Sequence, residues 1–256
     1  MDSLFDSPRF NESLFFPSPH LTPPPSGARD LRVEVAPGVG LHARLHHRDG
    51  TRAVLLLFHG NGEVVSHYDE PASRFADSDV DLAVVDYRGY GASDGTPTLR
   101  TCLADCHLVL DAVRDLAAGR PVVVMGRSLG SACAAELCQA PREGVVGYVF
   151  ESGIADVEGV VRRRGIDPRG AISDADRAVF DPLPKLRRCV APTLVLHGAD
   201  DALIPASEAQ TAYDALATAD KELVLVPGRG HNDLSWHPLY WEAMARFVAR
   251  VTGRGR

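Results

Sequence analysis

Three kinds of residue that together could carry out nucleophilic catalysis stand at separate places in the sequence. Ser128 lies in the stretch Gly126-Arg127-Ser128-Leu129-Gly130, His231 lies in a glycine-rich stretch, and Asp200 and Asp201 stand side by side. A serine hydroxyl is a weak nucleophile until a base removes its proton, and that base needs an acid to orient it. These residue types predict Ser128 as a nucleophile and His231 as its base, with either aspartate as the orienting acid.

The residues around Ser128 are those that a presented nucleophile requires. An apolar run at 122–125 precedes it, and an alanine- and leucine-bearing helical pattern follows. A serine held between a buried strand and a helix needs a sharp, strained turn, and its flanking residues must be small because the backbone passes close on both sides. The N–H of Leu129, directly after the nucleophile, is then a predicted donor to an oxyanion. Backbone N–H groups in the small-residue stretch 59–62, which follows the apolar run at 53–58, are predicted to supply the second donor.

From residue 53 onward, apolar runs alternate with segments of helical spacing. This alternation predicts an α/β fold with a mainly parallel sheet and helices on both faces. Parallel strands end at one edge of the sheet, where reacting groups gather. Three different predicted strands are followed by these residues: one by Ser128, one by the two aspartates and one by His231. We therefore expect them to meet at that edge. The predicted strands are 53–58, 81–86, 121–125, 144–150, 192–197 and 221–226, and the predicted helices are 68–76, 99–117, one ending near 138, 206–217 and 236–251.

The first residues predict an arm that packs on the domain. Residues 1–30 are rich in proline and weak in periodic pattern, which disfavours helix and sheet pairing. We expect an extended N-terminal arm, anchored by Leu14, Phe15 and Phe16; the alternative is a disordered tail.

The rest of the chain is expected to form a single domain, 31–256. It opens with an antiparallel hairpin, because 31–35 and 41–46 alternate apolar and polar residues around the turn residues between them. Residues 151–188 interrupt the rhythm of strands and helices. We expect them to form a short cap inserted over the sheet.

Composition narrows the class of protein. The 256 residues carry a formal net charge of -7, which gives no indication of a nucleic-acid partner. No apolar run approaches the roughly 20 residues that span a bilayer, and the first residues lack the basic start of a signal peptide. The five cysteines are an odd number, which favours reduced thiols and a cytoplasmic location. The cluster of Cys102, Cys106 and His107 offers too few ligands for a metal site. Neither a metal nor an organic cofactor is predicted.

Four motifs resemble the serine-hydrolase branch of the α/β-hydrolase superfamily. They are F-H-G-N at 58–61, D-Y-R-G-Y-G-A-S at 86–93, G-R-S-L-G at 126–130 and G-R-G-H-N-D at 228–233. The chain is similar to S33 serine aminopeptidase or "hydrolase 4" proteins and to α/β-hydrolase domain proteins of the acyl-protein thioesterase type. Eukaryotic members of the latter type carry an N-terminal membrane attachment that this sequence is not expected to have.

The resemblance implies an α/β-hydrolase fold and the chain order serine, aspartate, histidine. It implies Ser128 as nucleophile and His231 as base. In this branch the acid stands in H-G-x-x-D-x-[VL]-[IV]-P, a pattern that selects Asp201 over its neighbour. The oxyanion donors implied are the backbone N–H groups of Asn61 and Leu129.

The predicted function is therefore a serine hydrolase that cleaves a carboxylic ester or thioester through an acyl-enzyme, on a small-molecule or acylated substrate. An amidase or peptidase, or an acyltransferase, would use the same residues, and a non-catalytic interaction protein could keep the fold. The sequence does not indicate the acyl chain, the leaving group or the oligomeric state.

Other polar residues near the motifs are interpreted as structural. His59 is expected to shape the oxyanion loop rather than to act as a base. Asp86 and Arg88 are expected to hold their own loop, with substrate binding as the alternative, and 232–233 to order the histidine loop. The run 162–164, Arg-Arg-Arg, is typical of a solvated face. Because it lies in the predicted cap, a pocket that prefers anionic substrates is the alternative.

Overall fold

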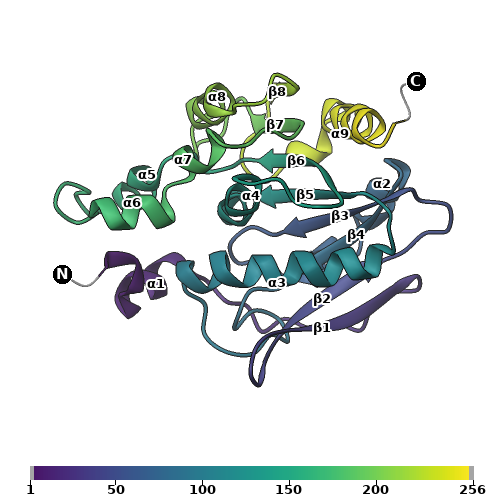
Figure 1. The fold of residues 1–256 in the computed structure, drawn as a ribbon, viewed down its shortest axis with the longest axis horizontal. Helices are drawn as coiled ribbons and strands as arrows, with labels where there is room; N and C mark the ends of the chain where they lie inside the picture. Colours follow the sequence, from purple (N-terminus) through teal and green to yellow (C-terminus); the bar gives the residue numbers. More distant parts are fainter. Residues whose placement is uncertain (1–2, 254–256) are drawn as a thin grey trace.

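The computed structural model describes residues 3–253 and contains an eight-stranded sheet in the order β1-β2-β4-β3-β5-β6-β7-β8 (Figure 1). β1 pairs antiparallel with β2, and β2 pairs antiparallel with β4, whereas all later pairs are parallel. This confirms the predicted α/β-hydrolase type of sheet with an antiparallel N-terminal pair. The strands are β1 (Ala28–Ala36), β2 (Val39–His46), β3 (Ala53–Phe58), β4 (Val80–Val85), β5 (Val122–Arg127), β6 (Val145–Glu151), β7 (Thr193–Gly198) and β8 (Lys221–Val226).

Helices cover both faces of this sheet. On one face α3 and α4 pack on the strands, and on the other α2 and α9 do so, which gives two separate apolar clusters. The predicted helix at 99–117 matches α3 at both ends, where Thr98 closes the first turn with a reciprocal capping box. The α-helices are α1 (Pro8–Leu14), α2 (Ala72–Asp77), α3 (Leu99–Ala117), α4 (Ser131–Cys138), α5 (Val157–Arg162), α6 (Asp174–Phe180), α7 (Pro182–Leu186), α8 (Ala206–Ala215) and α9 (Pro238–Val251); the short 3-10 turns are η1 (Leu4–Asp6), η2 (Val65–Tyr68), η3 (Ser128–Gly130) and η4 (Leu234–Trp236).

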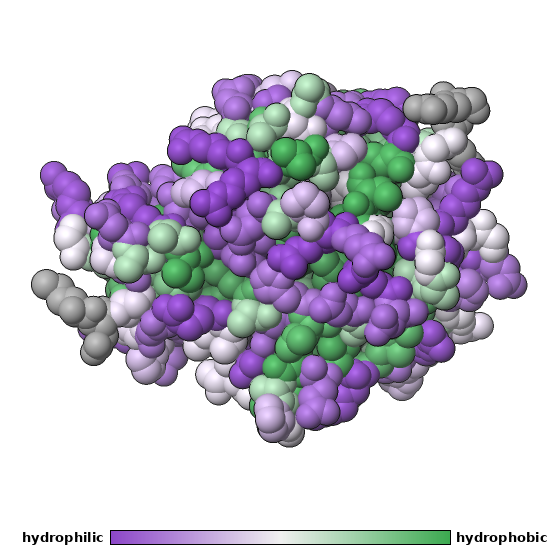
Figure 2. Space-filling model, viewed as in Figure 1, coloured by the Kyte–Doolittle hydropathy of each residue, from purple (hydrophilic) through white to green (hydrophobic). Residues whose placement is uncertain are grey.

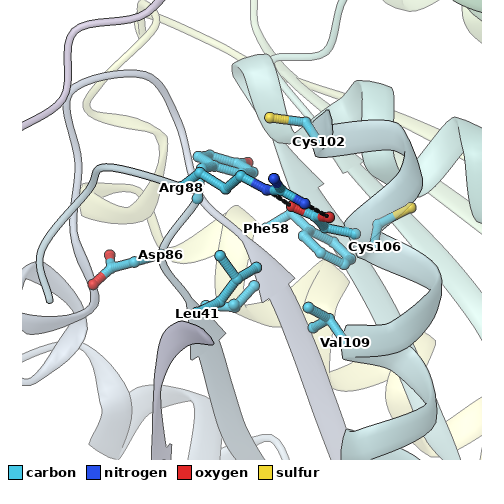
Figure 3. A pocket seen from close by; sticks show the side chains of 10 residues that line it. Leu41, Phe58, Asp86, Arg88, Cys102, Cys106 and Val109 are labelled. Carbon is cyan, nitrogen blue, oxygen red and sulfur yellow. Dashed lines mark hydrogen bonds and ion pairs between the residues drawn. The ribbon is translucent and has the colours of Figure 1, made fainter. Parts of the chain in front are cut away.

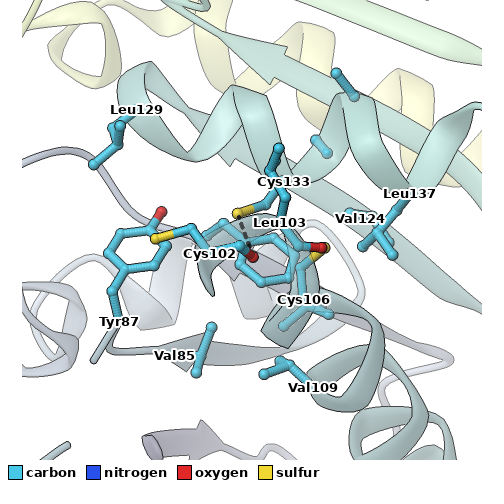
Figure 4. Packing of buried hydrophobic residues seen from close by; sticks show 14 of the residues in the cluster. Val85, Tyr87, Cys102, Leu103, Cys106, Val109, Val124, Leu129, Cys133 and Leu137 are labelled. Atoms are coloured by element: carbon cyan, nitrogen blue, oxygen red, sulfur yellow. Dashed lines mark hydrogen bonds between the residues drawn. The ribbon is translucent and has the colours of Figure 1, made fainter. Parts of the chain in front are cut away.

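The cysteines belong to the core rather than to the surface. Cys102 and Cys106 of α3 lie beside Cys133 of α4, among valine side chains of the sheet and leucine side chains of the two helices (Figure 4). All five cysteines are buried and free. Burial raises the pKa of the Cys102 and Cys106 thiols well above the usual range, so they behave as small apolar residues.

The first residues differ from the predicted extended arm, because they contain η1 and α1. Pro8 stands in the first turn of α1, where its missing N–H costs nothing, and Phe10 and Leu14 provide an apolar face for burial. Leu14 and Phe15 are buried as predicted, but Phe16 is 60% exposed and is not an anchor. The hairpin also begins earlier than predicted, at Ala28, inside the expected arm.

The interrupted segment at 151–188 contains three short helices, α5, α6 and α7. Each begins at a residue whose side chain accepts hydrogen bonds from the first turn, namely Asp156, Ser173 and Asp181. This segment packs on the N-terminal residues, since the Phe5 and Phe180 rings lie 4.5 Å apart between centroids. Weak periodicity hid these helices because each is only two turns or less.

The face of the molecule seen in Figure 2 is mostly polar, with apolar patches between the charged side chains. Within residues 3–253, no helix has both the length and the apolar character needed to cross a bilayer.

Candidate active site

The loops after three strands bring Ser128, His231 and Asp201 into one chain of contacts. Ser128 follows β5, Asp201 follows β7 and His231 follows β8. The Oγ of Ser128 lies 2.9 Å from Nε2 of His231, and Nδ1 of that ring lies 2.7 Å from Oδ2 of Asp201. The structure therefore brings these three side chains together at the carboxyl edge of the sheet, in one chain of hydrogen-bonding contacts.

The turn that holds Ser128 is as tight as its sequence suggested. Ser128 has a φ of 50°, a region that residues with a side chain rarely occupy. A Cβ at Gly126 would overlap the carbonyl of Gly130, and a Cβ at Gly130 would overlap the carbonyl of Phe58. Both flanking glycines are required by the close approach of neighbouring backbone.

Of the two adjacent aspartates, only Asp201 faces the histidine. Its side chain is buried, and Oδ1 accepts hydrogen bonds from the N–H groups of Leu203 (2.9 Å) and Ile204 (2.8 Å). Asp200 is exposed and donates its backbone N–H to Arg229. The loop thus turns one carboxylate inward and fixes it with two amides.

The loop that contains Asn61 lies at the same cleft as Ser128 and Leu129. The Asn61 side chain is occupied elsewhere, because Nδ2 donates to the carbonyl of Leu14 at 2.6 Å and Oδ1 accepts from the N–H of Phe16 at 2.9 Å. An oxyanion role for this residue can therefore fall only to its backbone N–H. His59 is buried and donates from Nδ1 to the carbonyl of Gly60 at 2.7 Å, which agrees with its predicted role in shaping the loop.

Asp86 and Arg88 hold structure rather than line the cleft. The buried Asp86 carboxylate accepts the N–H of Val65 at 2.9 Å and lies 2.9 Å from Nδ1 of His42. Arg88 makes two hydrogen bonds to Asp105 of α3, at 2.7 and 2.8 Å (Figure 3). The hollow beside this pair measures about 10 Å³, too small for a substrate.

Comparisons with known proteins relate this chain to hydrolases. A family model described as "Serine aminopeptidase, S33" matches residues 49–165. "Uncharacterized protein YfhR" of Salmonella typhi is 28% identical over 251 residues, covering 88% of this chain and 83% of that protein. Human "Alpha/beta hydrolase domain-containing protein 17B" is 29% identical over 206 residues, covering 77% of this chain and 66% of that protein.

Among solved structures, Est1E from Butyrivibrio proteoclasticus superposes with a TM-score of 0.71 at 18% identity, covering 88% of this chain and 99% of that one. The chain is a member of the α/β-hydrolase superfamily.

This α/β-hydrolase also has a buried ion cluster that sequence reasoning missed. Arg127, directly before the nucleophile, forms ion pairs with Glu63 and Glu151. Its Nη2 also donates to Oδ1 of Asn232 at 2.8 Å and to the carbonyl of His231 at 3.2 Å. Burial disfavours the charged guanidinium, but the two carboxylates outweigh burial and raise the pKa of Arg127.

The ion cluster connects the nucleophile's strand to the histidine loop, and a signal for it exists in the sequence. Arg127, Glu63 and Glu151 each end or follow one of three neighbouring strands, β5, β3 and β6. Within the histidine loop, Asp233 accepts the N–H of Gly230 at 2.7 Å, as expected of a loop-ordering residue.

The cleft of the α/β-hydrolase measures about 430 Å³, within the range of small-molecule sites. Its walls come from two segments outside the loops of Ser128, Asp201 and His231, and one of them contains the arginine run 162–164. The N-terminal segment contributes Ser13, Leu14 and Phe16, and the interrupted segment contributes Ile154, Arg163 and Arg164; Leu203 and Ile204 complete the lining near Asp201. In the part of the chain that the structure describes, no group of three or more His, Cys, Asp or Glu side chains is placed to hold a metal ion.

Proposed function

We propose that this α/β-hydrolase is a serine hydrolase that cleaves a carboxylic ester or thioester through an acyl-enzyme. The observation that carries the proposal is the unbroken chain of contacts, 2.9 Å from Ser128 to His231 and 2.7 Å from His231 to Asp201. This arrangement has the parts of a nucleophile, a general base and an orienting acid.

In the acylation step, Ser128 Oγ attacks the substrate carbonyl while Nε2 of His231 takes the hydroxyl proton. Asp201 accepts a hydrogen bond from Nδ1, which keeps the correct tautomer and stabilises the imidazolium. The oxyanion is held by the backbone N–H groups of Asn61 and Leu129. Collapse of the tetrahedral intermediate expels the alcohol or thiol, which takes the proton from His231.

In the deacylation step, His231 removes a proton from water, and the hydroxide attacks the acyl-enzyme. The second tetrahedral intermediate releases the carboxylic acid, and the proton returns to Ser128 Oγ. Every step uses side chains and amides of this chain, so the proposed mechanism needs no metal or organic cofactor. The buried, free cysteines fit a reducing compartment such as the cytoplasm.

A second candidate is cleavage of an amide or peptide bond. It is favoured by the description of the matched family model, which is that of a serine aminopeptidase. The two candidates share the nucleophile and differ in the leaving group, so substrates separate them. An acyltransferase would differ in the acceptor, and product analysis with water and an alcohol in competition would identify it.

The test combines covalent labelling with a substrate series. A fluorophosphonate probe should label the wild-type protein on Ser128, and Ser128→Ala should lose both labelling and turnover. p-Nitrophenyl esters and acyl thioesters of increasing chain length, compared with aminoacyl p-nitroanilides, would give the preferred leaving group. A folded wild-type protein that the probe does not label, and that hydrolyses none of these substrates, would overturn the proposal.

A further inference from the structure

The charges on the cleft walls do not balance. Among the described residues that line the cleft, Glu63 is the single carboxylate, whereas three arginines line it. Glu63 is engaged by Arg127 and also accepts hydrogen bonds from the Tyr68 hydroxyl and from a backbone N–H. The lining of this cleft is therefore cationic, although the whole chain has a net charge of -7.

Two of the three arginines are neutralised by carboxylates. Arg127 pairs with Glu63 and Glu151, and Arg163 pairs with Glu208 of α8. These guanidinium groups are bound to the protein's own acids and act as structure.

Arg164 is different, because it forms no ion pair with any carboxylate between residues 3 and 253. Its recorded side-chain hydrogen bond runs from Nε to the carbonyl of Ser13, at 3.0 Å. Burial and the neighbouring charge of Arg163 lower the pKa of Arg164, as expected for a half-buried cation without a counter-ion. A guanidinium stays charged at any physiological pH, so the site keeps an unneutralised positive charge.

The geometry of this side chain suits a planar anion. The bond to Ser13 uses Nε and ties the side chain to the opposite wall of the cleft. Both terminal nitrogens then remain without a partner within the described chain, and a guanidinium with its terminal nitrogens free binds a carboxylate through parallel hydrogen bonds.

We propose that Arg164 binds a carboxylate carried by the substrate, so that the preferred esters or thioesters are anionic. This inference rests on the proposed hydrolase function of the same cleft. It makes Arg164 a specificity-determining residue that touches substrate away from the reacting carbonyl.

The experiment measures the ratio of kcat/KM for a charged substrate to kcat/KM for its neutral counterpart. On the acyl side, mono-p-nitrophenyl esters of dicarboxylic acids are compared with their neutral methyl esters of the same length. On the leaving-group side, acyl esters of 4-hydroxybenzoate are compared with those of 4-hydroxybenzamide. In at least one of these two comparisons, we expect the wild type to have a higher kcat/KM for the charged substrate than for the neutral one. The comparison that shows this preference identifies which half of the substrate carries the carboxylate.

Arg164→Gln should reduce the charged-to-neutral ratio about tenfold. Arg164→Lys should restore part of it, because the charge returns without the planar fork. The matched control is Arg162→Gln: this neighbour pairs with Glu158 and does not line the cleft, so its ratio should equal that of the wild type. Raising the ionic strength with the wild type should lower the ratio, which tests the proposal without any variant.

The outcomes separate this inference from the proposed function. If the wild type hydrolyses neutral esters without preferring the charged members, or if Arg164→Gln keeps the wild-type ratio, the carboxylate site is wrong and the hydrolase proposal stands. If the wild type hydrolyses no ester of either kind and no probe labels it, the proposed function itself fails, and this inference fails with it.

Discussion

The floor and the walls of the cleft are built in different ways. The floor consists of Ser128, Asp201 and His231 on short loops at strand ends, and buried contacts hold it. The walls consist of the N-terminal segment and the interrupted segment. Away from the cleft the two segments pack on each other through the Phe5 and Phe180 rings. At the cleft itself, side-chain hydrogen bonds to main-chain carbonyls hold them, from Arg164 to Ser13 and from Asn61 to Leu14.

For the proposed hydrolase, this difference gives reactivity and selectivity separate structural origins. The sheet positions the three residues that we propose to break the bond, and any change there should be costly. The walls determine which molecule can reach that point, and changes there should shift preference at a smaller cost.

Among the residues of the floor, Asp201 should tolerate substitution least. Asp201→Asn keeps the shape but favours the wrong imidazole tautomer, so kcat should fall about 10³-fold or more. The matched control is Asp200→Asn, one residue away and exposed, which should keep nearly full activity. Steady-state kinetics on an activated ester measure both, and equal losses would show that the floor is not organised around Asp201.

The backbone of the floor should be equally intolerant. Gly130→Ala brings a Cβ into the carbonyl of Phe58, and the free energy of unfolding should fall by about 3 kcal/mol or more. The control is Gly119→Ala, at a φ of 87° with no atom within 4 Å of the new Cβ, which should cost about 1 kcal/mol from backbone strain alone. Urea unfolding measures both variants. Similar losses would mean that the close approach at the nucleophile turn is not a constraint.

The junction of floor and wall should respond to pH. Glu136 of α4 lies 2.6 Å from Nζ of Lys185 in α7. Burial alone would raise the pKa of the Glu136 carboxyl, but its bonds with His107 and Lys185 outweigh burial and lower the pKa to about 2. The unfolded chain takes up this proton near pH 4.5, so the stabilisation is complete above about pH 5 and is lost as the pH falls toward 2.

Glu136→Gln should therefore lower the free energy of unfolding by roughly 2 kcal/mol at pH 7, and the difference from the wild type should shrink at pH 3. Glu143→Gln serves as the control, because Glu143 is exposed and its pair with Arg114 should contribute well under 1 kcal/mol. A difference that stays constant from pH 7 to pH 3 would contradict the assignment of the stabilisation to the ionised carboxylate.

The walls should show the smallest effect at the Asn61 side chain. Asn61→Ala keeps the backbone N–H proposed for the oxyanion but removes the bonds to Leu14 and Phe16. We expect kcat on a short ester to fall less than tenfold, while proteolysis within the first 16 residues becomes faster. A loss as large as that of Asp201→Asn would mean that this side chain belongs to the floor.

The contrast also explains what the sequence could predict. The turn at Gly126, Ser128 and Gly130 could be predicted because its steric requirements fall within five consecutive residues. The alternation of apolar runs is likewise local and gave the sheet. The choice of Asp201 over its neighbour needed a motif, because two adjacent carboxylates are equivalent until the loop turns one of them inward.

The structure of the walls could not be predicted from the sequence in the same way. The main chain at Leu14 and Phe16 is held by Asn61, which lies 45 or more positions away, so the local sequence does not indicate that Phe15 is buried and Phe16 exposed. The helix α1 is seven residues long, too short for its periodicity to stand out beside the prolines that follow. Of the partners of Arg127, Glu151 ends β6 and Glu63 follows β3, and only the strand order makes them neighbours.

Asn61 contributes to both the floor and the walls of the cleft. Its backbone lies at the nucleophile's side of the cleft, while its side chain holds the N-terminal segment on both sides of Phe15. For the proposed hydrolase, this means in evolutionary terms that residues 13–16 are not free to diverge for a new substrate alone. A substitution there that shifts the main chain also shifts the loop beneath it, so selection on substrate preference acts on turnover through the same residue.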